Sequence, residues 1–150
     1  MAGTFSRLLY HVVFSTKGRF RFIDPILQAE LYPYIEGIIR NQGGWLLCLG
    51  GMPDQVHLLL RLKPDRAIAD LVRHVKGASS KWIHEQNGLW PDFAWQSGYA
   101  AFSVSESKEE AVRSYIERQE EHHRQASFEE EMVALLRKHR VEFDQAYVLD

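Results

Sequence analysis

The order of strand-like and helix-like segments is the feature that most constrains the fold of this chain. Four short segments are rich in apolar residues, and two longer segments between them repeat apolar residues every three or four positions. Gly, Pro, Asn and Asp separate the segments, as is typical of turns. The expected elements are strands over residues 7–16, 45–49, 56–62 and 99–104, and helices over 25–42 and 66–86.

Capping and stop residues mark the ends of these two helices. Asp24 is placed to cap the first helix, with Pro25 at its first helical position, and the glycines at 43–44 end it. Asp65 is the expected cap of the second helix, and the Asn-Gly pair at 87–88 is its expected stop.

The two middle strands are expected to form a hairpin with a loop of several residues, because residues 50–54 read GGMPD. The whole order is then β-α-β-β-α-β. It matches the ferredoxin-like arrangement, an α+β fold in which two helices cover one face of an antiparallel sheet. The other face is expected to be free for a ligand.

Two further helices are expected to follow the last strand, at about 107–124 and 127–139. Each begins with a capping box, Ser107 with Glu110 and Ser127 with Glu130. No internal repeat or linker divides the sequence. We therefore interpret residues 1–150 as a single domain, with a core over about 7–105 that is followed by these helices.

Charge is distributed unevenly along the sequence. The formal net charge of −2 argues, taken alone, against a nucleic-acid partner. Up to Lys81, however, 11 basic residues face 6 acidic ones, whereas the remainder holds 7 basic and 14 acidic residues. Such asymmetry is a hint of an anionic partner, and solvated charge on unrelated faces is the alternative.

Composition narrows the class of protein. An apolar content of 45% with 25% charged residues excludes a disordered chain. No apolar run approaches the roughly 20 residues of a membrane span, and the first residues lack a secretory cleavage site, so we expect a cytosolic protein. Cys48 lies in the run WLLCL, where a buried, inert thiol is the expected state.

The segment PDQVHLLLRL is the most informative stretch, because side chains alternate faces along a strand. One set, Val56, Leu58, Leu60 and Leu62, suits the helix-covered core. The other set is Gln55, His57, Leu59 and Arg61. It places a histidine and an amide about 6.5 to 7 Å apart, from where both could reach one cation. A structural histidine is the alternative.

The segment EEAVRSYIERQEEHHRQ predicts a helix in which Tyr115 and Gln119 share a face. Tyr115 also continues an apolar stripe, so a core tyrosine is an open alternative. The adjacent His122 and His123 diverge by roughly 100° on a helix, and we interpret them as a solvated pair.

Four runs in this order carry a resemblance to a known family: GGMPDQVHLLLRL, VRHVKGASSKWIHE, FAWQSGYAAFSVS and VRSYIERQEEHHR. Together they resemble the single-tyrosine HUH transposases. That family includes insertion-sequence transposases, which move single-stranded DNA, and the tyrosine transposases associated with repetitive extragenic palindromes (REP). The similarity extends from about Tyr10 to beyond Arg124.

The resemblance implies roles for four residues. His57 corresponds to the second of the two histidines that bind a divalent metal in the family, Tyr115 to its nucleophile and Gln119 to a metal ligand on the tyrosine helix. Gln55 stands where the family has its first histidine. An amide oxygen can ligate a hard cation such as Mg²⁺, so we expect Mg²⁺ or Mn²⁺ as cofactor, with weaker binding or a shifted metal preference.

The implied activity is that of a transposase that cleaves and rejoins single-stranded or hairpin DNA. The metal polarises the scissile phosphate while Tyr115 attacks phosphorus, a 3′ hydroxyl leaves, and a 5′-phosphotyrosine forms. Another 3′ hydroxyl can reverse this reaction without ATP. The resemblance also implies a homodimer and a bacterial-type cytoplasmic protein that is associated with the nucleoid when bound to DNA.

Basic and aromatic residues are expected to meet the DNA. The basic residues expected to contact phosphate are Lys17, Arg19, Arg21, Arg61, Lys63, Arg73, Lys76 and Lys81. One or two of the following aromatic residues are expected to stack on bases, the others being core: Trp82, Trp90, Phe93, Trp95 and Tyr99.

Two other functions fit parts of the sequence. Gln55 motivates a catalytically impaired relative that is retained as a hairpin or palindromic DNA-binding protein. An RNA-recognition module shares the element order, but the third strand lacks a basic-Gly-aromatic signature. The acidic run Glu129, Glu130 and Glu131 is interpreted as a solvated helix face.

Overall fold

The computed structural model describes residues 3–148 and contains one four-stranded antiparallel sheet with the order β2-β3-β1-β4. The strands are β1 (Leu8–Ser15), β2 (Gly44–Met52), β3 (Gln55–Leu62) and β4 (Ala100–Val104). Helix α1 (Pro25–Asn41) connects β1 to β2, and α2 (Ile68–His84) connects β3 to β4. The predicted β-α-β-β-α-β order and ferredoxin-like sheet are confirmed.

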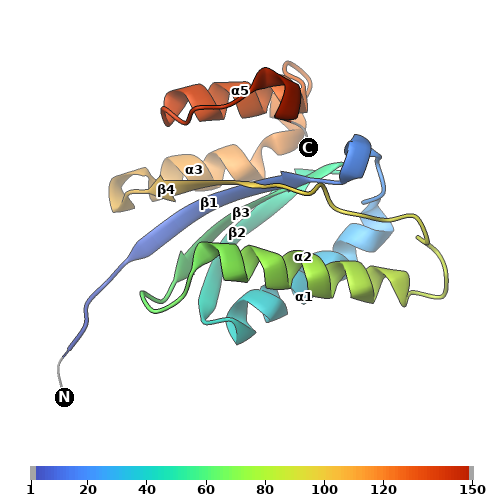
Figure 1. Ribbon diagram of the computed structural model, residues 1–150, viewed down its shortest axis with the longest axis horizontal. Coiled ribbons are helices and arrows are strands. Elements are labelled where there is room, and N and C mark those ends of the chain that lie inside the picture. The colour runs from blue at the N-terminus through green and yellow to red at the C-terminus, as the bar shows by residue number, and fades with distance from the viewer. Residues whose placement is uncertain (1–2, 149–150) are drawn as a thin grey trace.

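One face of the sheet is covered by α1 and α2, which lie side by side below it in Figure 1. The predicted cap of α1 is confirmed, since the Asp24 carboxylate accepts a hydrogen bond of 2.8 Å from the Leu27 backbone N–H. The predicted cap of α2 is wrong, because α2 begins after Ala67, which offers no side-chain hydrogen bond. The helix also ends at His84, ahead of the predicted stop.

The core beneath this face is almost entirely apolar, with the buried Ser79 of α2 accepting a hydrogen bond from Trp95 Nε1. The even-numbered side chains of β3 lie in it as predicted, together with one apolar stripe from each helix. Its members include Val12, Phe14, Leu31, Ile35, Leu58, Leu60, Val72 and Val75.

The hairpin between β2 and β3 is tighter than the sequence predicts. Both strands continue to a two-residue turn at Pro53 and Asp54, so Gly50 and Gly51 lie within β2. A Cβ atom on Gly50 would lie 2.5 Å from the carbonyl oxygen of Ile116, in the helix packed above. Gly50 therefore allows close approach of that helix to the sheet.

The face expected to be free is covered by the C-terminal helices, which lie above the sheet in Figure 1. These are α3 (Glu109–Glu117), α4 (Gln119–His122) and α5 (Phe128–Lys138). The helix predicted over 107–124 is interrupted at Arg118, whose φ of −102° and ψ of 24° are not helical.

The two predicted capping boxes differ in outcome. The Ser127–Glu130 box is present at the start of α5. At the other position a short 3₁₀ turn, Glu106–Lys108, precedes α3, and the Ser107 hydroxyl contacts that of Ser105 at 3.1 Å. Two more 3₁₀ turns cover Lys17–Arg19 and Gln145–Tyr147.

Over residues 3–148, no helix combines the length and the apolar character required for a membrane span.

Candidate active site

A group of polar side chains is buried between the sheet and the C-terminal helices. They come from β1, β3, α4 and α5, and they are His11, Gln55, His57, Gln119 and Glu131. Buried polar groups destabilise a fold unless they find partners, so their mutual contacts decide whether this group is tolerated.

His57 lies at the centre of the group and is fully buried. Its Nδ1 is 3.0 Å from Nε2 of His11 on the neighbouring strand, and its Nε2 is 3.1 Å from Oε1 of Glu131. Burial, followed by the proximity of His57, lowers the pKa of His11 to about 3. His11 is therefore neutral near pH 7 and fixes the orientation of the His57 ring through their hydrogen bond.

Glu131 projects from α5 into the site, which corrects the interpretation of residues 129–131 as a solvated face. Its side chain is only 1% exposed. Glu131 shares a helical stripe with the buried Phe128 and Met132, at i−3 and i+1, and this stripe faces the sheet. Glu130 is exposed in the capping box, and Glu129 contacts Gln145 at the surface.

The Glu131 carboxylate is held in its charged form. Burial acts to raise its pKa, but hydrogen bonds from His123, His57 and Tyr115 outweigh burial, so that the pKa lies below its usual range. Among the residues that the structure describes, all ion pairs of Glu131 are to histidines: His57, His122 and His123.

Tyr115, on α3, donates its O–H to Oε2 of Glu131. Its ring lies edge-on to those of His11 and His57, with centroid separations of 6.0 and 5.9 Å. Burial raises the pKa of the phenol, and the charge and hydrogen bond of Glu131 raise it further. In this arrangement Tyr115 is a neutral phenol whose proton points at a carboxylate.

His123 brings the two glutamines of the site together. Its Nε2 lies 2.6 Å from Nε2 of Gln55 and 3.0 Å from Oε1 of Gln119. It is also 3.3 Å from Oε1 of Glu131, and its side chain is 8% exposed. The structure thus gathers Gln55, His57 and Gln119 around one point, although their roles rest on the resemblance.

The interpretation of His122 and His123 as a solvated pair is wrong. His122 Nε2 lies 3.3 Å from Oε2 of Glu131, at an angle that makes no hydrogen bond, while His123 contacts the other carboxylate oxygen. The two rings diverge, as expected for adjacent helical residues, but each lies near a different oxygen of the same carboxylate. Both histidines follow the break at Arg118, and both contact Glu131.

The site has the donors that a divalent cation requires. The ligand atoms of His57, His123 and Glu131 all lie within 4.8 Å of one another. Gln55 Oε1 is buried and forms no hydrogen bond with the described residues. A buried amide oxygen without a hydrogen bond is costly on its own, and a cation would satisfy it.

A cleft of about 670 Å³ gives access to the site between β4, α3 and α5. Tyr115, Glu131 and His122 line it, and Lys108 and Lys138 contribute two cationic side chains. Tyr115 also borders a second hollow of about 360 Å³ beside Arg118. The phenol is therefore accessible from outside, and Lys108 and Lys138 are candidate phosphate contacts that sequence reasoning missed.

The eight predicted DNA-binding residues are not gathered on one surface. Lys17, Arg19 and Arg21 follow β1, at the end of the sheet where Gln55 begins β3. Arg61 and Lys63 lie at the other end of β3, with the Arg61 guanidinium 4.8 Å from the Trp45 ring centroid. The remaining three, Arg73, Lys76 and Lys81, are on α2, across the sheet from Tyr115.

Two of the α2 residues already have partners. Arg73 pairs with Asp70 at 3.1 Å. The Lys76 ammonium donates to the carbonyls of Ser97 and Gly98, and burial lowers its pKa. Neither is arranged as a free phosphate contact.

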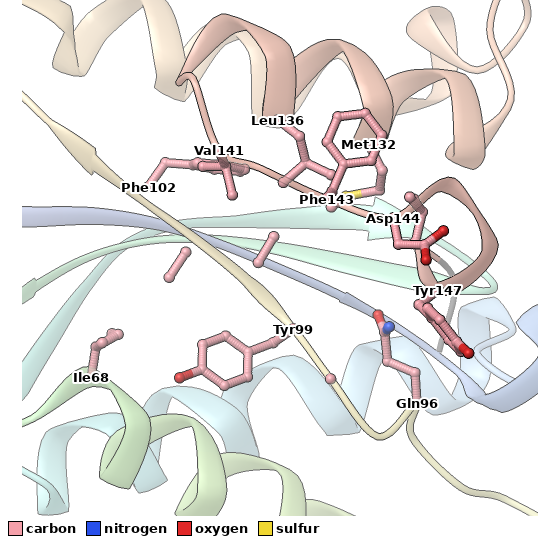
Figure 2. Close-up of a pocket in the computed structure, with 14 residues that line it drawn as sticks. Ile68, Gln96, Tyr99, Phe102, Met132, Leu136, Val141, Phe143, Asp144 and Tyr147 are labelled. Atoms are coloured by element: carbon pink, nitrogen blue, oxygen red, sulfur yellow. The ribbon is translucent and has the colours of Figure 1, made fainter.

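Most of the candidate aromatic residues are structural. Phe93 and Trp95 are buried in the core, and Trp82 stacks on Tyr34 with centroids 4.8 Å apart. Trp90 packs against the same core, and Tyr99 is 40% exposed. Tyr99 lines a pocket of about 620 Å³ beside β4 that Figure 2 shows, together with Phe143 and Tyr147. This pocket contains neither His57 nor Tyr115.

The chain is similar to known proteins in sequence and in fold. Residues 4–119 match the family described as "Transposase IS200 like". The ISDra2 transposase TnpA of Deinococcus radiodurans is 30% identical over 118 residues, which cover 75% of this chain and 84% of that protein.

Two solved structures have a similar fold. A crystal structure from Deinococcus radiodurans R1, assigned as a transposase, is 32% identical with a TM-score of 0.61, covering 79% of this chain and 95% of that one. A REP-associated tyrosine transposase bound to a REP hairpin has a TM-score of 0.62 at 13% identity, covering 82% of this chain and 74% of that one.

Proposed function

Because the chain belongs to the family of IS200-like transposases, we propose that it cleaves and rejoins single-stranded or hairpin DNA through a covalent bond to Tyr115. The observation that carries the proposal is the position of the Tyr115 O–H. It lies in a cleft of about 670 Å³ and beside a buried cluster of histidine, amide and carboxylate groups.

In the proposed reaction, the Tyr115 oxygen attacks the phosphorus of the scissile phosphate. The bond from phosphorus to the 3′ oxygen breaks, this oxygen takes up a proton from water and leaves as a 3′ hydroxyl, and the 5′ phosphate remains on the tyrosine. Glu131 accepts the O–H of Tyr115 in a hydrogen bond and is placed to receive the proton as the new bond forms. Attack by another 3′ hydroxyl on the phosphotyrosine restores the phenol and joins the strands.

The proposal assigns a divalent ion, Mg²⁺ or Mn²⁺, to the site. Gln55, His57 and Gln119 would hold it, and Gln55 Oε1, which has no hydrogen-bond partner within residues 3–148, fits this role because oxygen ligands suit such ions. When bound, the ion would neutralise charge on the phosphate oxygens. His11 keeps the ring of His57 oriented through the bond at Nδ1.

The proposed DNA partner is a hairpin or a single strand. The REP hairpin held by a protein of the same fold supports this choice, as do the lysines at 108 and 138 on either side of the cleft. We also propose that two copies assemble as a homodimer, as the resemblance implies.

A covalent-adduct assay tests the proposal. Hairpin oligonucleotide and protein are mixed with Mg²⁺ or Mn²⁺, and the protein–DNA adduct is separated on a denaturing gel. Wild type should form adduct, and Tyr115→Phe should form none, because the variant lacks the attacking oxygen. Tyr34→Phe, the same change across the sheet, should keep wild-type yield. Adduct that persists in Tyr115→Phe would overturn the assignment of the nucleophile.

A second candidate function is hairpin binding without cleavage. The observation that favours it is the arrangement of Tyr115, whose proton is held by Glu131, together with Gln55 in place of the family's first histidine. Hairpin binding with no cleavage under any divalent metal would support this function, whereas one robust cleavage product would eliminate it.

A further inference from the structure

Two groups of the buried cluster come from beyond the part of the chain that matches the family. The match ends at residue 119, whereas His123 follows α4 and Glu131 lies in α5. Both side chains are nevertheless largely buried: Glu131 contacts His57, and His123 contacts Glu131. The match to the family therefore does not indicate a role for these two residues.

The spacing of the donor atoms is that of neighbouring ligands on one ion. Ligands about 2.1 Å from a shared ion, at angles of 90° to 109°, lie about 3.0 to 3.4 Å from one another. Glu131 Oε1 is 3.1 Å from His57 Nε2 and 3.3 Å from His123 Nε2. The third pair, His57 and His123, also falls within the 4.8 Å limit of the cluster.

The surroundings hold the imidazole of His57 in place. Nδ1 of His57 is engaged by His11 at 3.0 Å, which leaves Nε2 directed at Glu131. Nε2 of His123 contacts the side chains of Gln55 and Gln119, and an ion bound at this nitrogen would take the place of these contacts. A hydrogen bond to the other ring nitrogen, as His11 makes to His57, is what orients an imidazole ligand in metal sites.

The charge of Glu131 also calls for a cation. Its carboxylate is 1% exposed, and within residues 3–148 no lysine or arginine pairs with it. A buried carboxylate is unfavourable unless a positive partner compensates its charge. A divalent ion between the three donors would supply that partner.

We propose that His123 and Glu131 bind the divalent ion together with His57, so that the centre has two histidines and one carboxylate in addition to the amides of Gln55 and Gln119. The second imidazole, which the family draws from the position of Gln55, is then supplied by His123. Because imidazole favours first-row transition ions, the centre prefers Mn²⁺ over Mg²⁺. The use of this ion in strand cleavage rests on the proposed function, but the ligand set does not.

Metal titration in the absence of DNA tests the ligand set. Mn²⁺ binding is measured by isothermal titration calorimetry on wild type, Glu131→Gln and Glu129→Gln. Glu131→Gln should weaken binding by at least about tenfold, because it removes a charged ligand. Glu129→Gln removes the same charge from a residue outside the buried stripe of α5. The affinity of this variant for Mn²⁺ should stay within about twofold of wild type. Unchanged affinity in Glu131→Gln, or no Mn²⁺ binding by wild type, would overturn the proposal.

A spectroscopic count of nitrogen ligands covers the case in which Glu131→Gln fails to fold. Electron spin-echo modulation of bound Mn²⁺ should report two imidazole nitrogens in wild type and one in His123→Ala. One nitrogen in wild type would contradict the ligand set. Tyr115→Phe should keep both nitrogens while it loses the adduct. Metal binding and strand cleavage are thus measured separately, so that failure of the proposed function can be distinguished from failure of this inference.

Discussion

The two faces of the sheet are packed in opposite ways. Beneath α1 and α2 nearly all buried side chains are apolar, with Phe14 and Leu58 among them. Beneath α3 to α5 the apolar residues form two separate clusters, one around Phe102 and one around Leu59. The polar group around His57 fills the space between them. The same strands thus contribute an apolar surface on one side and a chemical site on the other.

This difference separates stability from function within one sheet. Apolar burial stabilises the fold at about 25 cal/mol per Å² and requires no partner of defined geometry. Each buried polar group on the other face needs a directed contact, and Glu131 alone has contacts to Tyr115 and three histidines. The polar face is therefore where small geometric changes should alter chemistry, and the apolar face is where they should alter stability.

The largest effect that would test this separation is a truncation on the apolar face. Leu58→Ala should lower the free energy of unfolding by about 2 to 5 kcal/mol, because it leaves a cavity beneath α1 and α2. Urea denaturation measures the loss, and Leu58→Met should cost less than about 1.5 kcal/mol. Mn²⁺ affinity of folded Leu58→Ala should remain within about twofold of wild type. A tenfold change would show that the two faces are not independent.

Acidification should destabilise the polar face through His11. Burial and the nearby His57 lower the His11 pKa to about 3 from its ordinary 6.5, so the unfolded chain binds a proton between these values that the folded chain does not. Stability should therefore fall by about 1 to 2 kcal/mol from pH 6.5 to pH 5. Lys138 and His139 oppose protonation of His11, and Glu131 favours it.

Urea denaturation at several pH values measures this dependence, and His11→Gln should reduce it. His123 acts in the opposite direction, because the hydrogen bond and charge of Glu131 outweigh burial and raise its pKa. Its contribution is present at low pH and is lost as the pH rises through that pKa. His74→Gln, an exposed change on α2, should leave the wild-type profile intact. Equal profiles for wild type and His11→Gln would contradict the role of His11.

Local sequence patterns predicted the sheet and half of the site. The alternation along β3 placed Gln55 and His57 on one face, and the four-residue spacing placed Tyr115 beside Gln119, because both are properties of a single element. His11 lies on the matching face of β1, but only the register between the strands, which pairs His11 with Leu59 and Val13 with His57, brings it diagonally next to His57. That register depends on packing and is not written in either strand alone.

The other half of the site depends on contacts between distant segments. Glu131 contacts His57, which is 74 positions away in the sequence. Because residues 129 and 130 are also acidic, the sequence did not indicate that Glu131 belongs to the buried stripe of α5. His123 lies beyond the helix break at Arg118, and the sequence has no Gly or Pro there that would predict the break. The position of Glu131 between Phe128 and Met132 was the one local signal that could have identified it.

The smallest expected effect is restoration of an imidazole at residue 55. Gln55→His should tighten Mn²⁺ binding severalfold and increase adduct yield, because imidazole is a better ligand for Mn²⁺ than an amide oxygen. The gain should be modest, since His123 already supplies a second imidazole and its contact with Gln55 at 2.6 Å is lost. Calorimetry and the adduct gel measure both quantities, with Gln86→His on the opposite side of the sheet as control. An unchanged affinity and yield would mean that the amide at 55 limits neither, and that the polar face is complete without the family's first histidine.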